Sequence, residues 1–238
     1  MAESAYVPGV LIQSAETPRH SAIVRLTHWI NAFSFFGLLI SGIAILIAHP
    51  RLYWGETGSV ETPALINLPL PFVLKGQNGW GRSLHFLSAW ACVLNGLLYA
   101  LSGFFSAHFR KNVMPAKTDL TWKSLSDVFA DLRPQPQGAE PSGTYSVHQR
   151  LMYTAVVFVL FPVMIWTGLA MSPAVVSVFP SLVNLLGGPQ SARTIHFFVA
   201  ASLVIFVLIH VTMVYLTGFR NHMSAMITGH GTNRKGDT

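Results

Sequence analysis

Three of the ten histidines follow an arginine at the same spacing, and each motif opens a long apolar segment. The motifs are Arg25-Leu-Thr-His28, Arg82-Ser-Leu-His85 and Arg193-Thr-Ile-His196. Residues three apart share a helix face, so each arginine would lie one turn closer to water than its histidine. An imidazole is a metal ligand, and a guanidinium pairs with carboxylates. The repeated motif therefore predicts haem, with iron bound by the histidine and a propionate paired with the arginine.

A fourth histidine, His210, lies 14 residues after His196. At 100° per residue it comes within about 40° of the same helix face, and at 1.5 Å per residue the two are about 21 Å apart. A polar ring inside a membrane is costly unless it has a partner. One helix would thus offer a haem ligand near each side of a membrane.

Four uncharged apolar segments are long enough to carry these histidines. Only 10% of the 238 residues are charged and 51% are hydrophobic, which is wrong for a soluble domain. Crossing about 30 Å of hydrocarbon takes roughly 20 apolar residues. The predicted spans are residues about 24–49, 83–108, 149–171 and 194–218. The third span should end near Met171, because helix-breaking residues follow it: Pro173, Pro180 and Gly187-Gly188-Pro189. We predict a single domain of all-α class, an integral membrane four-helix bundle.

The distribution of lysine and arginine predicts the direction of the spans. Eleven lie at the two termini, in the connection at about 109–148 and, as Arg25 and Arg150, at the adjoining ends of the first and third spans, whereas four lie at about 50–82 and 172–193. The positive-inside rule then puts both termini in the cytoplasm and the other two connections in the periplasm of a bacterial inner membrane. The basic residues lie between apolar runs and form no single patch, which argues against nucleic acid as a partner.

This direction pairs the four histidines by depth. His28 opens a span on the cytoplasmic side, at the level of His210, whereas His85 and His196 both open on the outer side. We predict two haem b groups, one ligated by His28 and His210 and the other by His85 and His196. Arg25, Arg82 and Arg193 are the predicted propionate partners. Two imidazoles leave iron no open position, which suits electron transfer.

The constellation resembles the di-haem cytochrome b membrane subunits of bacterial nickel-iron hydrogenases, respiratory formate dehydrogenases and thiosulfate reductases, and the thiosulfate-reductase type most closely. The resemblance extends over all four spans, and it implies haem-iron ligands on the first, second and fourth helices. The residues that carry it are Arg25-Leu-Thr-His28-Trp29-Ile-Asn31, His85-Phe86-Leu87, His148-Gln-Arg-Leu-Met-Tyr153, Trp166-Thr-Gly-Leu, His196 and His210.

The resemblance implies a partner and a substrate as well. In such subunits electrons pass between a periplasmic oxidoreductase, of the molybdopterin or nickel-iron hydrogenase type, and membrane quinone bound near the cytoplasmic haem. Carried over to this chain, His148 and Gln149 would lie near the quinone pocket, with Asn31 and Tyr153 as further candidates. These four side chains suit a helix cap or an interhelical hydrogen bond equally well.

Other functions remain open at this point. One is a stand-alone quinone-linked cytochrome b that oxidises a small reductant, and another is a haem-free membrane anchor for a partner complex. A transporter would use the histidines as proton relays and would place carboxylates inside the spans, which contain none. The presence of reduced b-type absorption bands separates the cytochromes from the anchor.

Overall fold

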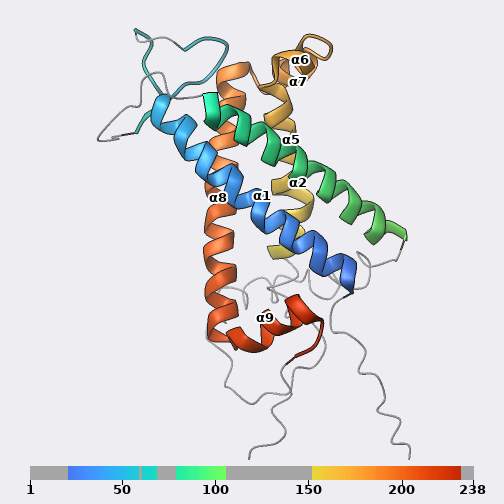
Figure 1. Ribbon diagram of the computed structural model, residues 1–238. Coiled ribbons are helices and arrows are strands. Elements are labelled where there is room, and N and C mark those ends of the chain that lie inside the picture. Colours follow the sequence, from blue (N-terminus) through green and yellow to red (C-terminus); the bar gives the residue numbers. More distant parts are fainter. Residues whose placement is uncertain (1–20, 59–60, 69–78, 106–151, 232–238) are drawn as a thin grey trace, which may run out of the picture.

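The computed structural model describes residues 21–58, 61–68, 79–105 and 152–231. Four helices in this part are long and apolar enough to cross a membrane, which confirms the predicted four-span architecture (Figure 1). They are α1 (Ala22–Ala48), α2 (Gly79–Phe105), the third helix (Met152–Ala170) and α8 (Pro189–Leu216). The predicted cytoplasmic connection lies largely outside the described residues.

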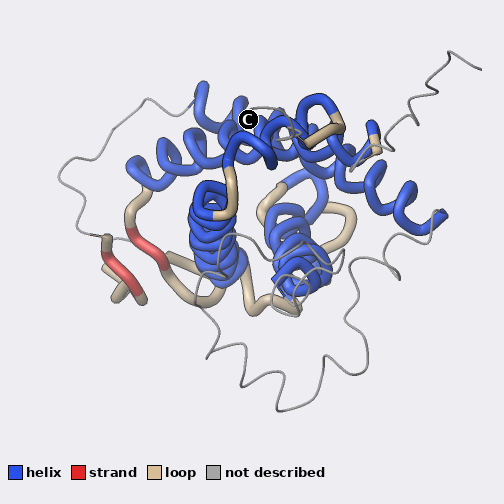
Figure 2. The backbone as a smooth tube through the Cα atoms, turned by 90° about the horizontal axis from the view of Figure 1, so that it is seen from below, coloured by secondary structure: helices blue, strands red, loops and turns tan. Residues whose placement is uncertain are grey.

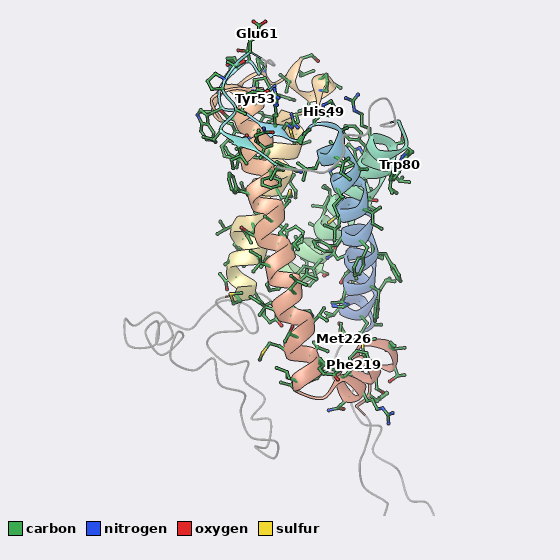
Figure 3. All side chains as sticks on the ribbon, turned by 90° about the vertical axis from the view of Figure 1, so that its left-hand side faces the viewer. His49, Tyr53, Glu61, Trp80, Phe219 and Met226 are labelled. Carbon is green, nitrogen blue, oxygen red and sulfur yellow. The ribbon has the colours of Figure 1, made fainter. Side chains whose placement is uncertain are left out.

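Short elements occur where the sequence predicts only connections. Strands β1 (Arg51–Leu52) and β2 (Ile66–Asn67) pair antiparallel, α6 (Pro173–Val176) and α7 (Ser181–Asn184) follow the third helix, and α9 (Phe219–Thr228) follows α8. We call the end of the bundle with β1, β2, α6 and α7 the cap end. Figure 3 shows His49 and Tyr53 at this cap end, and Phe219 and Met226 of α9 at the opposite, α9 end.

The spans form two hairpins. Helix α1 packs along α2, and α5 (Phe161–Ala170), the later part of the third helix, packs along α8. The third helix and α8 stand side by side, and α1 and α2 run obliquely across them (Figures 1 and 2). The four predicted haem ligands come from α1, α2 and α8, so each predicted pair joins the two hairpins.

Small polar residues form the contact between α1 and α2. Thr27, Ser34 and Ser41 recur every seven residues on α1 and are buried. A Cβ at Gly37 would collide with Ser88 on α2. Helices in lipid gain little from burying apolar side chains against each other, so close contact depends on small residues of this kind.

The third helix contains a π-helical turn, η3 (Val156–Leu160). Its distinctive bond runs from the N–H of Phe161 to the carbonyl of Val156, five residues back. Pro162 follows directly, has no N–H, and its ring clashes with the carbonyl four residues earlier in a regular α-helix. The wider turn therefore accommodates the proline inside an otherwise continuous span.

Hydrogen bonds to the backbone of the loop after α1 hold the cap end to the start of α8. The carbonyl of Gly55 accepts from the N–H of Gln190 at 3.1 Å, and the N–H of Gly55 donates to Oγ of Ser191 at 2.8 Å. Oγ1 of Thr194 donates to the carbonyl of Tyr53 at 2.6 Å. These bonds fix the loop after α1 against the helix that carries His196.

Gly188 is required at this junction. Its φ of +112° disfavours any residue with a Cβ, and a Cβ there would approach the carbonyl of Gly55. We expect Gly188→Ala to destabilise the cap end by about 1–3 kcal/mol or more, since strain and collision act together. Thermal unfolding of the detergent-solubilised chain measures the effect. Gly79→Ala is the control, because a Cβ at Gly79 meets no atom within 4 Å; equal midpoints in both variants would contradict the prediction.

Candidate functional site

At the cap end, the structure brings together His85 on α2 and His196 on α8. Their ring centres are 6.3 Å apart and their planes are inclined at 59°. Each ring also contacts a hydroxyl on the other helix of its own hairpin. Oγ of Ser41 on α1 lies 3.0 Å from Nδ1 of His85, and Oγ1 of Thr167 on α5 lies 2.9 Å from Nδ1 of His196.

At the α9 end, His28 on α1 faces His210 on α8. Their ring centres are 6.5 Å apart and their planes are inclined at 50°. The ring of Phe206, one turn earlier on α8, stacks on His210 at 6.0 Å. Tyr153 of the third helix meets Phe206 edge to face at 6.3 Å. Aromatic rings thus line one side of this histidine pair.

Both pairs have the separation that iron between two imidazoles requires. A bond between a metal and an imidazole nitrogen is about 2.0–2.1 Å long, so two such bonds in line separate the ring centres by roughly 6 Å. The separations of 6.3 and 6.5 Å agree with this value. Within the described residues no group of three or more His, Cys, Asp or Glu gathers as a closed metal site would need. The residues fit a haem with two axial ligands; their role as ligands stays a prediction.

Two of the three predicted propionate partners already donate to backbone carbonyls. Arg25 donates to the carbonyl of Ile227 on α9 at 2.9 Å, and Arg193 donates to the carbonyl of His49 at the end of α1. Arg82 is exposed at the cap end. A guanidinium has five N–H donors, so these bonds leave donors for an anionic group. The propionate role of all three stays a prediction.

Positive charge gathers beside the cap-end pair. Burial lowers the pKa of His49, and the charges of Arg193 and Arg82 lower it further. His49 therefore stays neutral at pH 7, and the two arginines are close enough to act on the same imidazole. The haem propionates, which are anionic, would find favourable charge at this end of the bundle.

The four quinone-pocket candidates divide into two groups. His148 and Gln149 lie outside the described residues. Asn31 joins α1 to α2, because its Oδ1 accepts from Nδ2 of Asn95 at 2.8 Å. Nδ2 of Asn95, a buried residue, also donates to the carbonyl of Thr27 at 2.8 Å. Tyr153 lies beside the α9-end pair through Phe206. A quinone role for any of these residues stays a prediction.

Our sequence interpretation missed the hydroxyl partners of the cap-end histidines. A signal was present: Ser41-Gly42-Ile43-Ala44 in the first span matches Thr167-Gly168-Leu169-Ala170 in the third. A Cβ at Gly42 would touch Cε1 of His85 at 3.7 Å, and a Cβ at Gly168 would touch Cε1 of His196 at 3.7 Å. The first and third spans thus each place a hydroxyl and a glycine against a histidine of the span that follows, His85 on the second and His196 on the fourth. This equivalence agrees with a duplicated helical hairpin.

The four membrane helices and the two imidazole pairs agree with a helical membrane protein of the b-type cytochrome class. Residues 19–229 match the family model described as prokaryotic cytochrome b561, and the chain belongs to this family of haem-binding membrane electron-transfer proteins. It is also 31% identical over 213 residues to the putative protein-methionine-sulfoxide reductase subunit YedZ1 of Azospira oryzae. That alignment covers 89% of this chain and 96% of the relative. No solved structure matches the chain significantly.

Proposed function

We propose that this chain is a di-haem b-type cytochrome subunit that transfers electrons across the bacterial inner membrane, between an oxidoreductase partner and the quinone pool. One observation carries the proposal: two histidine pairs join the two hairpins, one near each end of α8. The ring centres in these pairs are 6.3 and 6.5 Å apart. Haem held at such a site supplies reversible one-electron transfer.

The chain's own residues would hold and insulate these electron carriers. His85 and His196 would hold the cap-end haem, and His28 and His210 the α9-end haem. Because His210 follows His196 by 14 positions on α8, the ligands are about 21 Å apart along the helix axis. The surplus of cations at the termini supports an α9 end that faces the cytoplasm and a cap end that faces the periplasm.

The named relative supports a reductase as the partner. YedZ1 is described as a subunit of a putative protein-methionine-sulfoxide reductase. A reductase consumes electrons, so its membrane subunit would take them from quinol at the α9 end and release them at the cap end. Of the two partner types that the sequence resemblance implies, this direction favours a periplasmic molybdopterin reductase over a hydrogenase.

The quinone would exchange electrons beside His28 and His210. Tyr153 reaches this pair through Phe206, and Asn31 lies one turn after His28 on α1. His148 and Gln149, which precede Tyr153 in the sequence, are the further candidates that the family resemblance implies for this pocket. Asn31 and Gln149 would orient the quinone ring by hydrogen bonds, and His148 and Tyr153, whose side chains carry an ionisable proton, would exchange protons with it.

The haem content of the purified chain tests the proposal. We expect the full chain, expressed with ample haem supply, to contain two haem b per polypeptide and to show reduced b-type absorption bands. The pyridine haemochrome assay with protein quantification measures the ratio. His49→Ala is the control and should keep both haems, because His49 belongs to neither pair. A colourless chain would favour the haem-free anchor, and a single haem would refute the two-site assignment.

A further inference from the structure

We propose that Ser41 and Thr167 are positioning residues that hold the two cap-end imidazoles in one tautomer and thereby set the redox potential of the cap-end haem. This inference rests on the proposed function, since it concerns haem held by His85 and His196. It assigns a role to two side chains that do not touch the iron.

The first step is the position of the hydroxyl protons. Oγ of Ser41 lies 2.6 Å from the carbonyl oxygen of Gly37, and Oγ1 of Thr167 lies 2.8 Å from that of Val163. A carbonyl oxygen can only accept, and a hydroxyl has one proton to donate. Each hydroxyl proton is therefore directed to its own helix, four residues back.

The tautomer of the histidines follows from these donors. Because both hydroxyl protons are used, each hydroxyl oxygen can only accept from the imidazole, at 3.0 Å for Ser41 and 2.9 Å for Thr167. Nδ1 of His85 and Nδ1 of His196 must then carry the hydrogens. In a neutral imidazole this leaves the lone pair on Nε2, the nitrogen that remains available to bind iron.

The hydroxyls are placed where water cannot replace them. Ser41 and Thr167 each have 0% of their surface exposed. The neighbouring glycines leave room for the ring edges, since a Cβ at either position would already touch Cε1. At the α9 end, the ring of His210 stacks on Phe206.

A hydrogen-bond acceptor at Nδ1 affects the iron through the ring. It fixes the orientation of the ligand and raises its basicity. A more basic imidazole stabilises ferric iron more than ferrous iron, because the oxidised metal carries the higher charge. Removing either hydroxyl should therefore raise the potential of the cap-end haem and leave the α9-end haem unchanged.

Redox titration of the purified full chain tests this inference. We expect Ser41→Ala and Thr167→Val each to shift one of the two midpoint potentials upward, with a larger shift in the double variant. The low-spin EPR signal of the same haem should also change, because it reports the angle between the two imidazole planes. The conservative variants Ser41→Thr and Thr167→Ser keep a hydroxyl and should restore both readouts.

Ser34→Ala is the matched control. Ser34 is buried on the same face of α1, seven residues before Ser41, and makes no described hydrogen bond to an imidazole. The Ser34→Ala variant should leave both midpoint potentials unchanged. Unchanged potentials and EPR spectra in Ser41→Ala and Thr167→Val, with two haems bound, would overturn the proposal.

Loss of haem from a variant also tests whether the hydroxyl positions the imidazole. Selective loss of the cap-end haem in Thr167→Val but not in Thr167→Ser would support the positioning role. Equal loss in both would overturn it, because the hydroxyl would then not be the determinant. A haem-free unsubstituted chain would refute the proposed function instead, so the two failures are distinguishable.

Discussion

His210→Ala should reduce the haem content from two per chain to one, with loss of the spectrum of the α9-end haem. The physical reason is that His28 would be left as the one imidazole for that iron, in place of the pair that faces each other at 6.5 Å. Non-covalently bound haem depends on its axial bonds, so losing one of two should leave the site empty. Since the α9-end haem is the proposed partner of quinol, reduction of the remaining haem by quinol should become undetectable or nearly so.

The measurement combines the haemochrome assay with reduction of the chain by a soluble quinol analogue. His222→Ala is the matched control: His222 also lies near the α9 end, but its Nε2 contacts Oγ1 of Thr217 at 3.1 Å and it belongs to neither pair. This control should retain two haems and full quinol reduction. Retention of both haems in His210→Ala would refute the assignment of His28 and His210 as one site.

His196→Ala should have the complementary effect and remove the cap-end haem. The variant would leave His85 alone on α2 and Thr167 without its imidazole. Quinol should still reduce the α9-end haem, since its ligands lie about four turns away on α8. Electron delivery to a partner at the cap end should stop, because the remaining haem lies at the far side of the membrane. A variant that accepts electrons from quinol but does not deliver them at the cap end would thus separate the two electron-transfer steps.

Stopped-flow absorbance can follow both steps, first with quinol alone and then with an electron acceptor that cannot cross the membrane. Ser202→Ala is a suitable control, because Ser202 is exposed on α8 and its hydroxyl donates to the carbonyl of Phe198. The assignment fails if His196→Ala loses the α9-end haem and keeps the cap-end one.

The sequence by itself determined the four membrane spans and the depth of the histidines. Hydrocarbon thickness fixes the length of a span, and helix geometry fixes the face and rise of each residue. The 14-residue spacing between His196 and His210 therefore placed them on one face near opposite ends of α8. The same regularity matched His28 with His210 and His85 with His196, and these rings lie together in the structure.

The helix starts show the limit of hydropathy. Helix α2 begins at Gly79 and α8 at Pro189, earlier than the apolar segments that predict them. Glycines, two arginines and polar residues lie in the first turns of these helices, and backbone hydrogen bonds continue where the apolar pattern does not. The elements α6, α7, β1 and β2 are too short to show an apolar pattern in the sequence that would identify them.

Only the tertiary structure decided which side chains meet across the bundle. Ser41 lies 44 residues from His85, and Thr167 lies 29 residues from His196. Asn31 bonds to Asn95, 64 residues away. Hydropathy reports the depth of a residue in the membrane, whereas such contacts depend on how each helix is rotated and tilted against its neighbours. Rotation and tilt follow from the packing of small residues between helices, which no single span specifies alone.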